Sequence, residues 1–335
     1  MNAIRVHPAT PPAPSFSPTN PAPSSALHLD HLPIPSPQAP DEILIRVHAS
    51  TIIRDTLTWP EIYAHPYTIP GHDFAGTVAA TFPGANSPFA PGDEVFGMAH
   101  ADRGSTWAEY TVIRINEVAR KPRTLNWAAA AALPLSAQTA LEALEHAGVE
   151  GLGTEAPSGA APGARRVLIT GAVGGVGIYL VQLAAAAGLR VVAATSSNTR
   201  NEEFLRGLGA DEVVEYAALE NDKAQFDIVV DTVGGEVLAG CWGVVRERGS
   251  LISVDSASFD FVEEHKRRGI WRDDIKALFF IVKGSARVLQ ALADLVDRGA
   301  LKSFVAGSYP LAQAQEAYDY ASGRYTGRGK IVLTV

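Results

Sequence analysis

The second half of the chain alternates short apolar runs with longer segments in which apolar residues recur at helical spacing. Strands are predicted at residues 166–170, 190–194, 212–215, 226–231 and 250–254. Helices are predicted between them, at residues 175–187, 199–208 and 236–245. Near-continuous apolar strands that alternate with helices are typical of a parallel sheet buried on both faces. The pattern therefore predicts an α/β fold with a doubly wound parallel sheet.

The first part of the chain has a different pattern, in which short apolar runs are separated by Gly and Pro. Residues 43–47, 76–78 and 92–97 have the β-branched content that is typical of strands. The preceding residues 8–40 are rich in proline, which excludes a helix and predicts an extended course over the surface. The alternative for this segment is a poorly ordered connection. This part is therefore predicted to be a β-rich domain of short strands.

Further elements connect and close these parts. Asn126 is predicted to cap an Ala-rich helix that begins at Trp127, breaks at Pro134 and resumes as far as Gly148. Residues 151–164, rich in Gly, Ala and Pro, are predicted to form a linker or surface loop. Toward the C-terminus the pattern predicts helices at 285–298 and 311–322 and a strand at 330–335.

The composition fits two folded domains. The 335 residues suffice for two sizeable cores, and 47% apolar with 19% charged residues is typical of a globular protein. A net charge of −8 gives no attraction to nucleic acid, and no apolar run reaches the roughly 18 residues of a membrane span. The N-terminus lacks a signal-peptide core, and the single Cys241 excludes an intrachain disulfide. We therefore expect a cytoplasmic protein without nucleic-acid or membrane partners.

A glycine-rich turn follows the first strand of the parallel sheet. Residues 167–170 are succeeded by Gly171-Ala172-Val173-Gly174-Gly175-Val176-Gly177 and then by an amphipathic helix. A side chain at Gly174 would block the approach of the backbone to a pyrophosphate, and Gly177 lets the helix pack close to the strand. The helix N-terminus offers N–H groups and its positive dipole end to the phosphates. A strand, turn and helix in this order predict the dinucleotide-binding turn of a Rossmann domain.

The end of the second strand indicates which dinucleotide is bound. NAD-specific sites place Asp or Glu there to bind the ribose hydroxyls, whereas this chain has Thr195-Ser196-Ser197-Asn198-Thr199-Arg200, without an acid. Hydroxyls and a guanidinium bind a 2′-phosphate, and each charge-assisted hydrogen bond contributes roughly 1.5–3 kcal/mol. Ser196 and Arg200, with Ser197 as a further candidate, are therefore predicted to select NADPH. The alternative is a Ser/Asn-rich loop with a solvated arginine.

Short motifs along the chain carry a family resemblance. They are Pro70–Gly76, Pro91–Gly97, Ala108–Tyr110, Ala131–Leu135, Leu208–Asp211, Asp231–Gly235 and Gly329–Leu333. Taken in this order, they resemble the zinc-independent quinone oxidoreductase and enoyl reductase branch of the medium-chain dehydrogenase/reductase superfamily. The likeness spans nearly the whole chain.

The resemblance implies a division into two domains. Residues 1–130 and 283–335 are expected to form a GroES-like catalytic domain, and residues 131–282 the Rossmann domain inserted between them. The family also implies an active cleft at the domain junction and a homodimer.

The resemblance assigns further cofactor contacts. The pyrophosphate-binding segment corresponds to Gly174, Gly175, Val176 and Gly177. Ser196 and Arg200 correspond to the family's 2′-phosphate contacts, and Tyr216 to a tyrosine near the adenosine. Val233 is expected along the cofactor, and Phe279, Phe280 and Ile281 beside the nicotinamide. The aromatic residues among these also fit simple core packing.

A catalytic zinc ion is the main alternative in the same superfamily. His72-Asp73 occupies the place of a His-Glu pair in zinc alcohol dehydrogenases, but residues 51–55 and 129–133 lack the cysteines of a zinc site. A zinc site needs three protein ligands in compact geometry. Here His72 would need unusual partners such as His65 or His100. We therefore predict no metal and expect His72 to contact the substrate or to line the cleft.

Without a metal, a conjugated substrate is the easier one to reduce. Hydride added to the β-carbon of an enone or quinone spreads charge onto a distant oxygen, which hydrogen-bond donors stabilise. Because Ile52-Ile53-Arg54-Asp55 replaces the family's Asn-Pro-x-Asp segment, the pocket is expected to be apolar and to favour a small hydrophobic α,β-unsaturated carbonyl over a simple quinone. Trp59 and Trp107 are candidate lining residues.

Catalytic candidates in the loop before His72 are Tyr63 and Tyr67, which with water are possible proton donors. For both tyrosines, packing within a surface loop is the alternative role. The leading hypothesis is an NADPH-dependent reductase of activated C=C bonds or quinones. A dehydrogenase with an atypical metal site at His72 and a non-catalytic NADPH-binding protein are the other two hypotheses.

Overall fold

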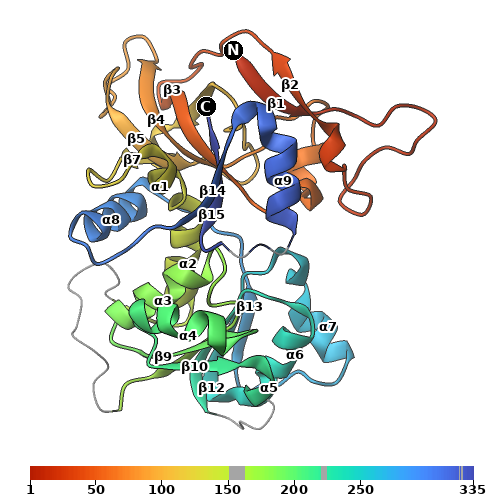
Figure 1. Cartoon of the computed structure of the whole chain (residues 1–335), viewed down its shortest axis with the longest axis vertical. Helices are drawn as coiled ribbons and strands as arrows, with labels where there is room; N and C mark the ends of the chain where they lie inside the picture. The colour runs from red at the N-terminus through yellow and green to blue at the C-terminus, as the bar shows by residue number, and fades with distance from the viewer. Residues whose placement is uncertain (151–162, 220–224, 324, 326) are drawn as a thin grey trace. The chain divides into compact units, whose positions relative to one another are not determined.

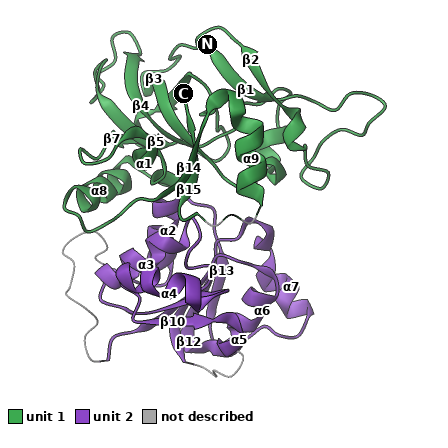
Figure 2. Ribbon diagram, viewed as in Figure 1, with its two compact units in different colours: residues 1–135, 283–335 green, residues 136–282 purple. Residues whose placement is uncertain are grey.

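The computed structural model describes residues 1–150, 163–219, 225–323, 325 and 327–335. It divides the chain into two compact units (Figure 2), residues 1–135 with 283–335 (unit 1) and residues 136–282 (unit 2). The expected first boundary followed residue 130, whereas the units meet after Leu135, inside helix α2 (Pro134–His146). The chain thus begins unit 1, forms the whole of unit 2 and returns to complete unit 1.

Unit 2 contains a six-stranded sheet in which every neighbouring pair is parallel, in the order β10-β9-β8-β11-β12-β13. Its strands are β8 (Arg166–Ile169), β9 (Arg190–Thr195), β10 (Glu212–Glu215), β11 (Phe226–Asp231), β12 (Val245–Ser253) and β13 (Lys276–Phe279). The strand order runs outward in both directions from β8 and β11. This is the doubly wound arrangement that the apolar runs predict, because strands covered on both faces need no polar alternation.

Helices connect these strands (Figure 1). They are α3 (Gly177–Ala186), α4 (Asn198–Gly207), α5 (Tyr216–Leu219), α6 (Gly235–Val244) and α7 (Phe261–Arg267). The predicted helices correspond to α3, α4 and α6 with ends shifted by one or two residues. The short α5 and the strongly charged α7 were not predicted, because neither has a clear apolar period.

Unit 1 is built on a sheet that joins the two ends of the chain, in the order β14-β15-β3-β4-β5-β7, with β6 paired to β3. Its strands are β3 (Glu42–Ile52), β4 (Asp73–Thr81), β5 (Glu94–Met98), β6 (Tyr110–Arg114), β7 (Val118–Arg120), β14 (Val305–Pro310) and β15 (Lys330–Thr334). The closing strand β15 pairs antiparallel with β3. A β-rich domain made from both chain ends therefore agrees with the sequence prediction.

The proline-rich N-terminal segment has more regular structure than predicted. Strand β2 (Leu27–His31) lies within it and pairs antiparallel with β1 (Asn2–Val6), which the apolar pattern also failed to indicate. Strand β2 is extended and mostly exposed, as predicted, and only its pairing with β1 was not predicted. The two strands stabilise each other by pairing that starts at Asn2 and His31. These residues are far apart in the sequence, so the local pattern of apolar residues does not indicate the pairing.

The helices of unit 1 begin and end as their sequences indicate. They are α1 (Trp127–Ala131), α8 (Ala286–Asp297) and α9 (Ala314–Ser322). The Asn126 side chain caps α1 by accepting a hydrogen bond of 2.9 Å from the amide of Ala129, and Pro134 begins α2. Most of the predicted linker 151–164 lies outside the described residues.

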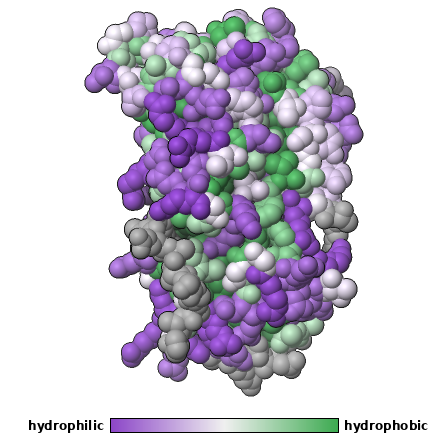
Figure 3. Space-filling model, turned by 60° about the vertical axis from the view of Figure 1, so that its left-hand side comes forward, coloured by the Kyte–Doolittle hydropathy of each residue, from purple (hydrophilic) through white to green (hydrophobic). Residues whose placement is uncertain are grey.

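Polar and apolar residues are interspersed on the face drawn in Figure 3. Within the described ranges, no helix has both the length and the apolar character needed to cross a bilayer.

Candidate functional site

The glycine-rich turn lies at the carboxyl end of β8 and leads into α3. Gly171 has a positive φ of 59°, and a Cβ added there would overlap the hydroxyl of Thr232. A Cβ at Gly177 would overlap the carbonyl oxygen of Gly171, and one at Gly174 would lie 3.1 Å from that oxygen. Glycine is thus required at Gly171 and Gly177 for the turn to close on the first turn of α3.

A buried carboxylate ties this turn to the neighbouring strand. Asp231, the last residue of β11, accepts hydrogen bonds from the Thr170 hydroxyl at 2.6 Å and from the Gly234 amide at 2.9 Å. Burial raises the pKa of Asp231, and these hydrogen bonds oppose the rise. The Thr232 hydroxyl donates to the Thr170 carbonyl at 3.0 Å. The turns after β8 and β11 are therefore held as one rigid edge.

This edge is where the strand order reverses. After β8 the chain adds β9 and β10 on one side, and β11, β12 and β13 continue on the other. In doubly wound sheets, ligands bind beyond the carboxyl ends of the strands at such a switch point. The glycine positions leave the backbone accessible there, and α3 makes no side-chain cap bond at its N-terminus. The arrangement fits the pyrophosphate of a dinucleotide.

The predicted adenosine-side residues follow β9. Ser196 and Arg200 are exposed, and Ser197 is the N-cap of α4 without a side-chain capping bond. Tyr216, the first residue of α5 directly after β10, accepts a hydrogen bond of 2.9 Å from the amide of Gly171. The structure therefore brings Tyr216 directly to the glycine-rich turn, as well as to the adenosine side of the sheet.

An acid that the sequence analysis missed stands beside the predicted 2′-phosphate contacts. Glu215, the last residue of β10, accepts a hydrogen bond of 2.8 Å from the amide of Asn198, the first residue of α4. The segment 195–200 itself contains no acid, as predicted, but its neighbour supplies one. The register of β9 and β10, with Glu215 opposite Thr195, was the signal that would have indicated it.

The remaining predicted cofactor contacts also lie at strand ends in unit 2. Val233 follows β11 and is 39% exposed, and its side chain borders Gly171. Phe280 follows β13, and its ring centroid lies 4.6 Å from that of His146 on α2. The predicted residues of the Rossmann domain therefore share the carboxyl edge of a single sheet.

In unit 1, His72 directly precedes β4 and is 2% exposed. Its Nδ1 lies 3.3 Å from the Ala99 carbonyl oxygen, which only accepts hydrogen bonds, so Nδ1 carries the proton of the neutral ring. Nε2 is then a bare acceptor, buried without a hydrogen-bond partner among the residues that the structure describes. Burial lowers the pKa of His72 below the ordinary 6.5 and favours this neutral form.

Two unsatisfied donors lie on the segment next to His72. The ring of Trp59 is tilted against the imidazole with centroids 5.3 Å apart, and its Nε1 is buried without a hydrogen-bond partner in the described part of the chain. Thr56, in the short 3-10 helix 56–58, has a buried hydroxyl that also has no hydrogen-bond partner among the described residues. Because buried polar atoms are normally satisfied, each of these two donors is available to a polar ligand or a water molecule. Thr56 was not predicted, and its pattern gave no signal.

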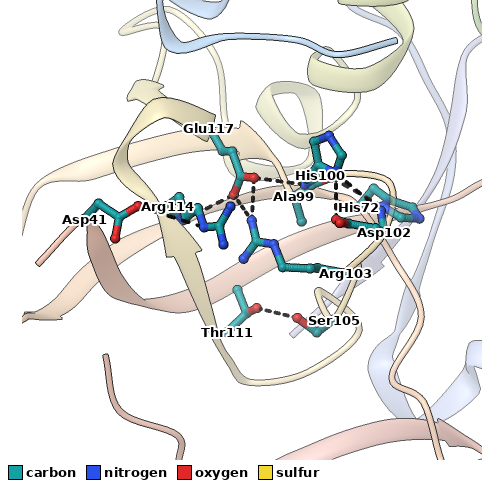
Figure 4. Close-up of polar contacts among 10 residues, drawn as sticks. All are labelled: Asp41, His72, Ala99, His100, Asp102, Arg103, Ser105, Thr111, Arg114 and Glu117. Carbon is teal, nitrogen blue, oxygen red and sulfur yellow. Dashed lines mark hydrogen bonds and ion pairs between the residues drawn. The ribbon is translucent and has the colours of Figure 1, made fainter. Parts of the chain in front are cut away.

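The loop after β5 is held by Glu117 (Figure 4). The Glu117 carboxylate is paired with Arg103 and accepts a hydrogen bond of 3.3 Å from the amide of His100. The ring of His100 bonds Asp102 at 2.6 Å, and this hydrogen bond lowers the pKa of Asp102. This loop carries the Ala99 carbonyl that orients His72.

The residues around His72 do not fit a zinc site. Within the described ranges, no group of three or more His, Cys, Asp or Glu side chains is placed to hold a metal ion. The neighbouring Asp73 is fully buried, accepts hydrogen bonds of 2.6 Å from Thr51 and from the Leu135 amide, and lies 3.2 Å from the Lys330 ammonium. His100, the suggested partner, is bonded to Asp102 instead.

Aromatic residues predicted near the substrate have different surroundings. The Tyr63 hydroxyl donates to the Leu57 carbonyl and accepts a hydrogen bond of 2.8 Å from the Ala22 amide. Tyr67 has a positive φ of 61°, and the Arg5 guanidinium lies 4.5 Å from its ring centroid. Trp107 is fully buried and donates to the Thr51 carbonyl at 3.0 Å, so it is core rather than pocket lining.

Comparison with protein families gives two matches. Residues 39–123 match the alcohol dehydrogenase GroES-like domain, and residues 208–333 match the family described as zinc-binding dehydrogenase.

Individual relatives match most or all of the length of this chain. A protein of Arthroderma benhamiae named "probable zinc-binding oxidoreductase, mitochondrial" is 36% identical over 93% of this chain and 94% of its own length. The 2-methylene-furan-3-one reductase of Solanum lycopersicum is 33% identical over 78% of this chain and 62% of its own length. The solved quinone oxidoreductase from Coxiella burnetii is 26% identical, with a TM-score of 0.83 over 100% of this chain and 99% of its own.

Proposed function

Because the chain belongs to the medium-chain dehydrogenase/reductase family of oxidoreductases, we propose that it is a metal-free, NADPH-dependent reductase of activated C=C bonds or quinones. The observation that carries the proposal is the turn 171–177, where glycine is required for close packing and the backbone remains accessible to a pyrophosphate. A cytoplasmic location is still a prediction that rests on the sequence alone.

In this proposal the dinucleotide lies along the carboxyl edge of the unit 2 sheet, and its nicotinamide supplies the hydride. Gly174, Gly175, Val176 and Gly177 bind the pyrophosphate through backbone N–H groups and the N-terminus of α3. The 2′-phosphate is bound by Ser196, Ser197 and Arg200. Tyr216, Val233 and Phe280 border the adenosine, the cofactor backbone and the nicotinamide in turn.

The donor set around His72 favours a conjugated substrate. The carboxylate of Asp73 is bonded to Lys330 and Thr51, so it is not available as a metal ligand beside His72. In this proposal no metal ion therefore acts as a Lewis acid to stabilise an alkoxide. An enone or quinone spreads the charge that hydride addition creates, so neutral hydrogen-bond donors suffice. Relatives named 2-methylene-furan-3-one reductase and quinone oxidoreductase support this substrate class.

Residues of unit 1 supply the polar contacts in this proposal. Trp59 Nε1–H and the Thr56 hydroxyl donate to the substrate oxygen, and the bare Nε2 of His72 accepts from a substrate hydroxyl or from a bound water. The Tyr63 hydroxyl already donates one hydrogen bond and accepts another, so its role in this proposal is to position the segment around Leu57. The proton then comes from Tyr67 or from water.

Oxidation of NADPH, followed at 340 nm against a panel of enones and quinones in the presence of EDTA, tests the proposal. Turnover that survives the chelator, with zinc absent by elemental analysis of the same sample, is the expected result. Stoichiometric zinc together with loss of activity in EDTA would instead establish a metal-dependent dehydrogenase. Tight NADPH binding without turnover of any substrate in the panel would indicate a binding protein.

A further inference from the structure

Glu215 occupies a special position in the nucleotide edge of unit 2. It ends β10 directly opposite Thr195, the last residue of β9, and its Oε1 accepts the amide of Asn198 at 2.8 Å. The N-cap residue Ser197 makes no side-chain capping bond, and the first turn of α4 contains no acid. The carboxylate of a neighbouring strand therefore caps a helix whose own sequence provides no cap.

The same amide and the same helix end attract phosphate. A ten-residue helix such as α4 carries partial positive charge at its N-terminus, where anions are stabilised. The proposed 2′-phosphate contacts Ser196, Ser197 and Arg200 surround this end. A carboxylate already bound there competes for the amide and repels a group with about two negative charges.

We infer that Glu215 limits the discrimination of this pocket between NADPH and NADH. The inference rests on the proposed dinucleotide site. With NADH, the carboxylate keeps its bond to Asn198 or accepts from a ribose hydroxyl, as acids do in NAD-specific sites. With NADPH, the carboxylate of Glu215 either stays close to the 2′-phosphate or moves away from it, whereas Arg200 and the two serines attract the phosphate. The pocket therefore combines opposing charges and accepts both coenzymes with a modest preference.

The variant Glu215→Gln isolates the charge. Glutamine retains an oxygen that accepts the Asn198 amide, so the cap survives while the repulsion disappears. Glu203→Gln is the matched control, because it removes one charge from an exposed position on α4 itself, away from the helix end. Dissociation constants of NADPH and NADH for the full chain, measured by titration calorimetry, give the ratio of the two affinities.

We expect Glu215→Gln to raise the preference for NADPH about fivefold to thirtyfold, the effect of removing one charge beside a doubly charged phosphate at a solvated site. Glu203→Gln is expected to change it less than twofold. Adenosine 2′,5′-bisphosphate and AMP used as probes should show the same shift, since they contain the 2′-phosphate without the nicotinamide.

Two outcomes would overturn the inference. One is an unchanged or reduced NADPH preference in Glu215→Gln, and the other is an equal rise in the control. A wild-type protein that prefers NADH would contradict the proposed coenzyme, yet the inference would stand if Glu215→Gln still shifted the ratio toward NADPH. If the wild-type chain binds neither dinucleotide, both are wrong.

Discussion

At the scale of single residues, the bare Nε2 of His72 is the most informative atom of unit 1. Its acceptor character follows from the Ala99 carbonyl on the other side of the ring, which accepts a hydrogen bond from Nδ1 and so keeps the only proton of the neutral imidazole on that nitrogen. The sequence marked His72 as a substrate contact but contained nothing about this tautomer, because residue 99 reaches it through folding of a distant loop.

Two substitutions separate the two ring nitrogens of His72. His72→Asn retains a donor to the Ala99 carbonyl and removes Nε2, whereas His72→Gln retains an acceptor near the Nε2 position. The loss of the hydrogen bond from a substrate hydroxyl or a bound water, about 1 kcal/mol, predicts a roughly fivefold lower kcat/KM for His72→Asn. His72→Gln is expected to keep more activity. Equal activity of both variants and the wild type would remove His72 from the site.

Stability should depend on pH through the same residue. Because burial lowers the pKa of His72 below 6.5, the unfolded chain binds more protons than the native one once the pH falls below that value. The charges facing the ring are Asp73 and Lys330, which oppose each other, and the backbone carbonyls of the loop at Ala99 and His100. The free energy of unfolding should therefore decline as the pH falls through 6.5 toward 5.

Comparison with His72→Asn isolates this contribution. Urea unfolding of both proteins between pH 5 and 8 should show a steeper decline for the wild type, by at most about 1.4 kcal/mol per pH unit. Other histidines with lowered pKa, His48 and His265, are present in both proteins and cancel. Parallel curves would show that His72 does not titrate differently in the two states.

The two tyrosines before His72 are distinguished by their hydroxyl bonds. Tyr63→Phe loses two hydrogen bonds to backbone groups, so we expect a lower free energy of unfolding by about 1–3 kcal/mol with little change in kcat per folded molecule. Tyr67→Phe should leave stability unchanged. A lower kcat for Tyr67→Phe, together with a changed solvent isotope effect on kcat, would identify Tyr67 as the proton donor. An unchanged kcat would assign the proton to water.

At the scale of elements, the turn and the first turn of α3 form one unit of packing. A methyl group at Gly177 overlaps the Gly171 carbonyl, so Gly177→Ala must separate the turn from the helix. We expect a loss of stability of about 1–3 kcal/mol and at least a hundredfold weaker NADPH binding. Thermal unfolding and titration of the same sample measure both effects.

A second glycine provides the control for that substitution. Gly240 lies exposed inside α6, with nothing within 4 Å of an added Cβ. Gly240→Ala should therefore stabilise the protein by about 0.5–1 kcal/mol and leave NADPH binding unchanged. If Gly177→Ala behaved like Gly240→Ala, the close packing of the turn would have no role in binding.

The same elements show what sequence pattern predicts and what it does not. The βαβ unit around β8 and β9 is visible because its apolar runs, turn glycines and helix period are local. The pairing of β1 with β2, and the bond from Glu215 to Asn198, depend on residues brought together by register. The hydrogen bonds of Tyr63 to Leu57 and Ala22 fit its alternative role of packing within the loop, and these partners are not apparent from its own neighbourhood in the sequence.

At the scale of the whole molecule, the two edges of the unit 2 sheet differ in character. The edge strand β10 has a glutamate at each end, Glu212 and Glu215, and charge at an edge discourages pairing with another sheet. The edge strand β13 has the sequence Lys-Ala-Leu-Phe, so it has a charge at its start only. It leads into Phe280, which is half-buried, and Ile281, which is 64% exposed. Among the strands that the structure describes, β13 pairs with β12 alone.

The homodimer that the family resemblance implies is a prediction at this scale. We expect two copies to associate through β13, since a twofold axis beside an edge strand pairs it with itself and covers the apolar residues that follow. Light scattering should then give twice the chain mass of 35.4 kDa. Hydrogen exchange locates the interface: on dilution below the dimer dissociation constant, amides of β13 should exchange faster. Amides of the central strand β8, flanked by β9 and β11, should not change. A monomer at all concentrations, or a dimer whose β13 amides are insensitive to dilution, would contradict association through this edge.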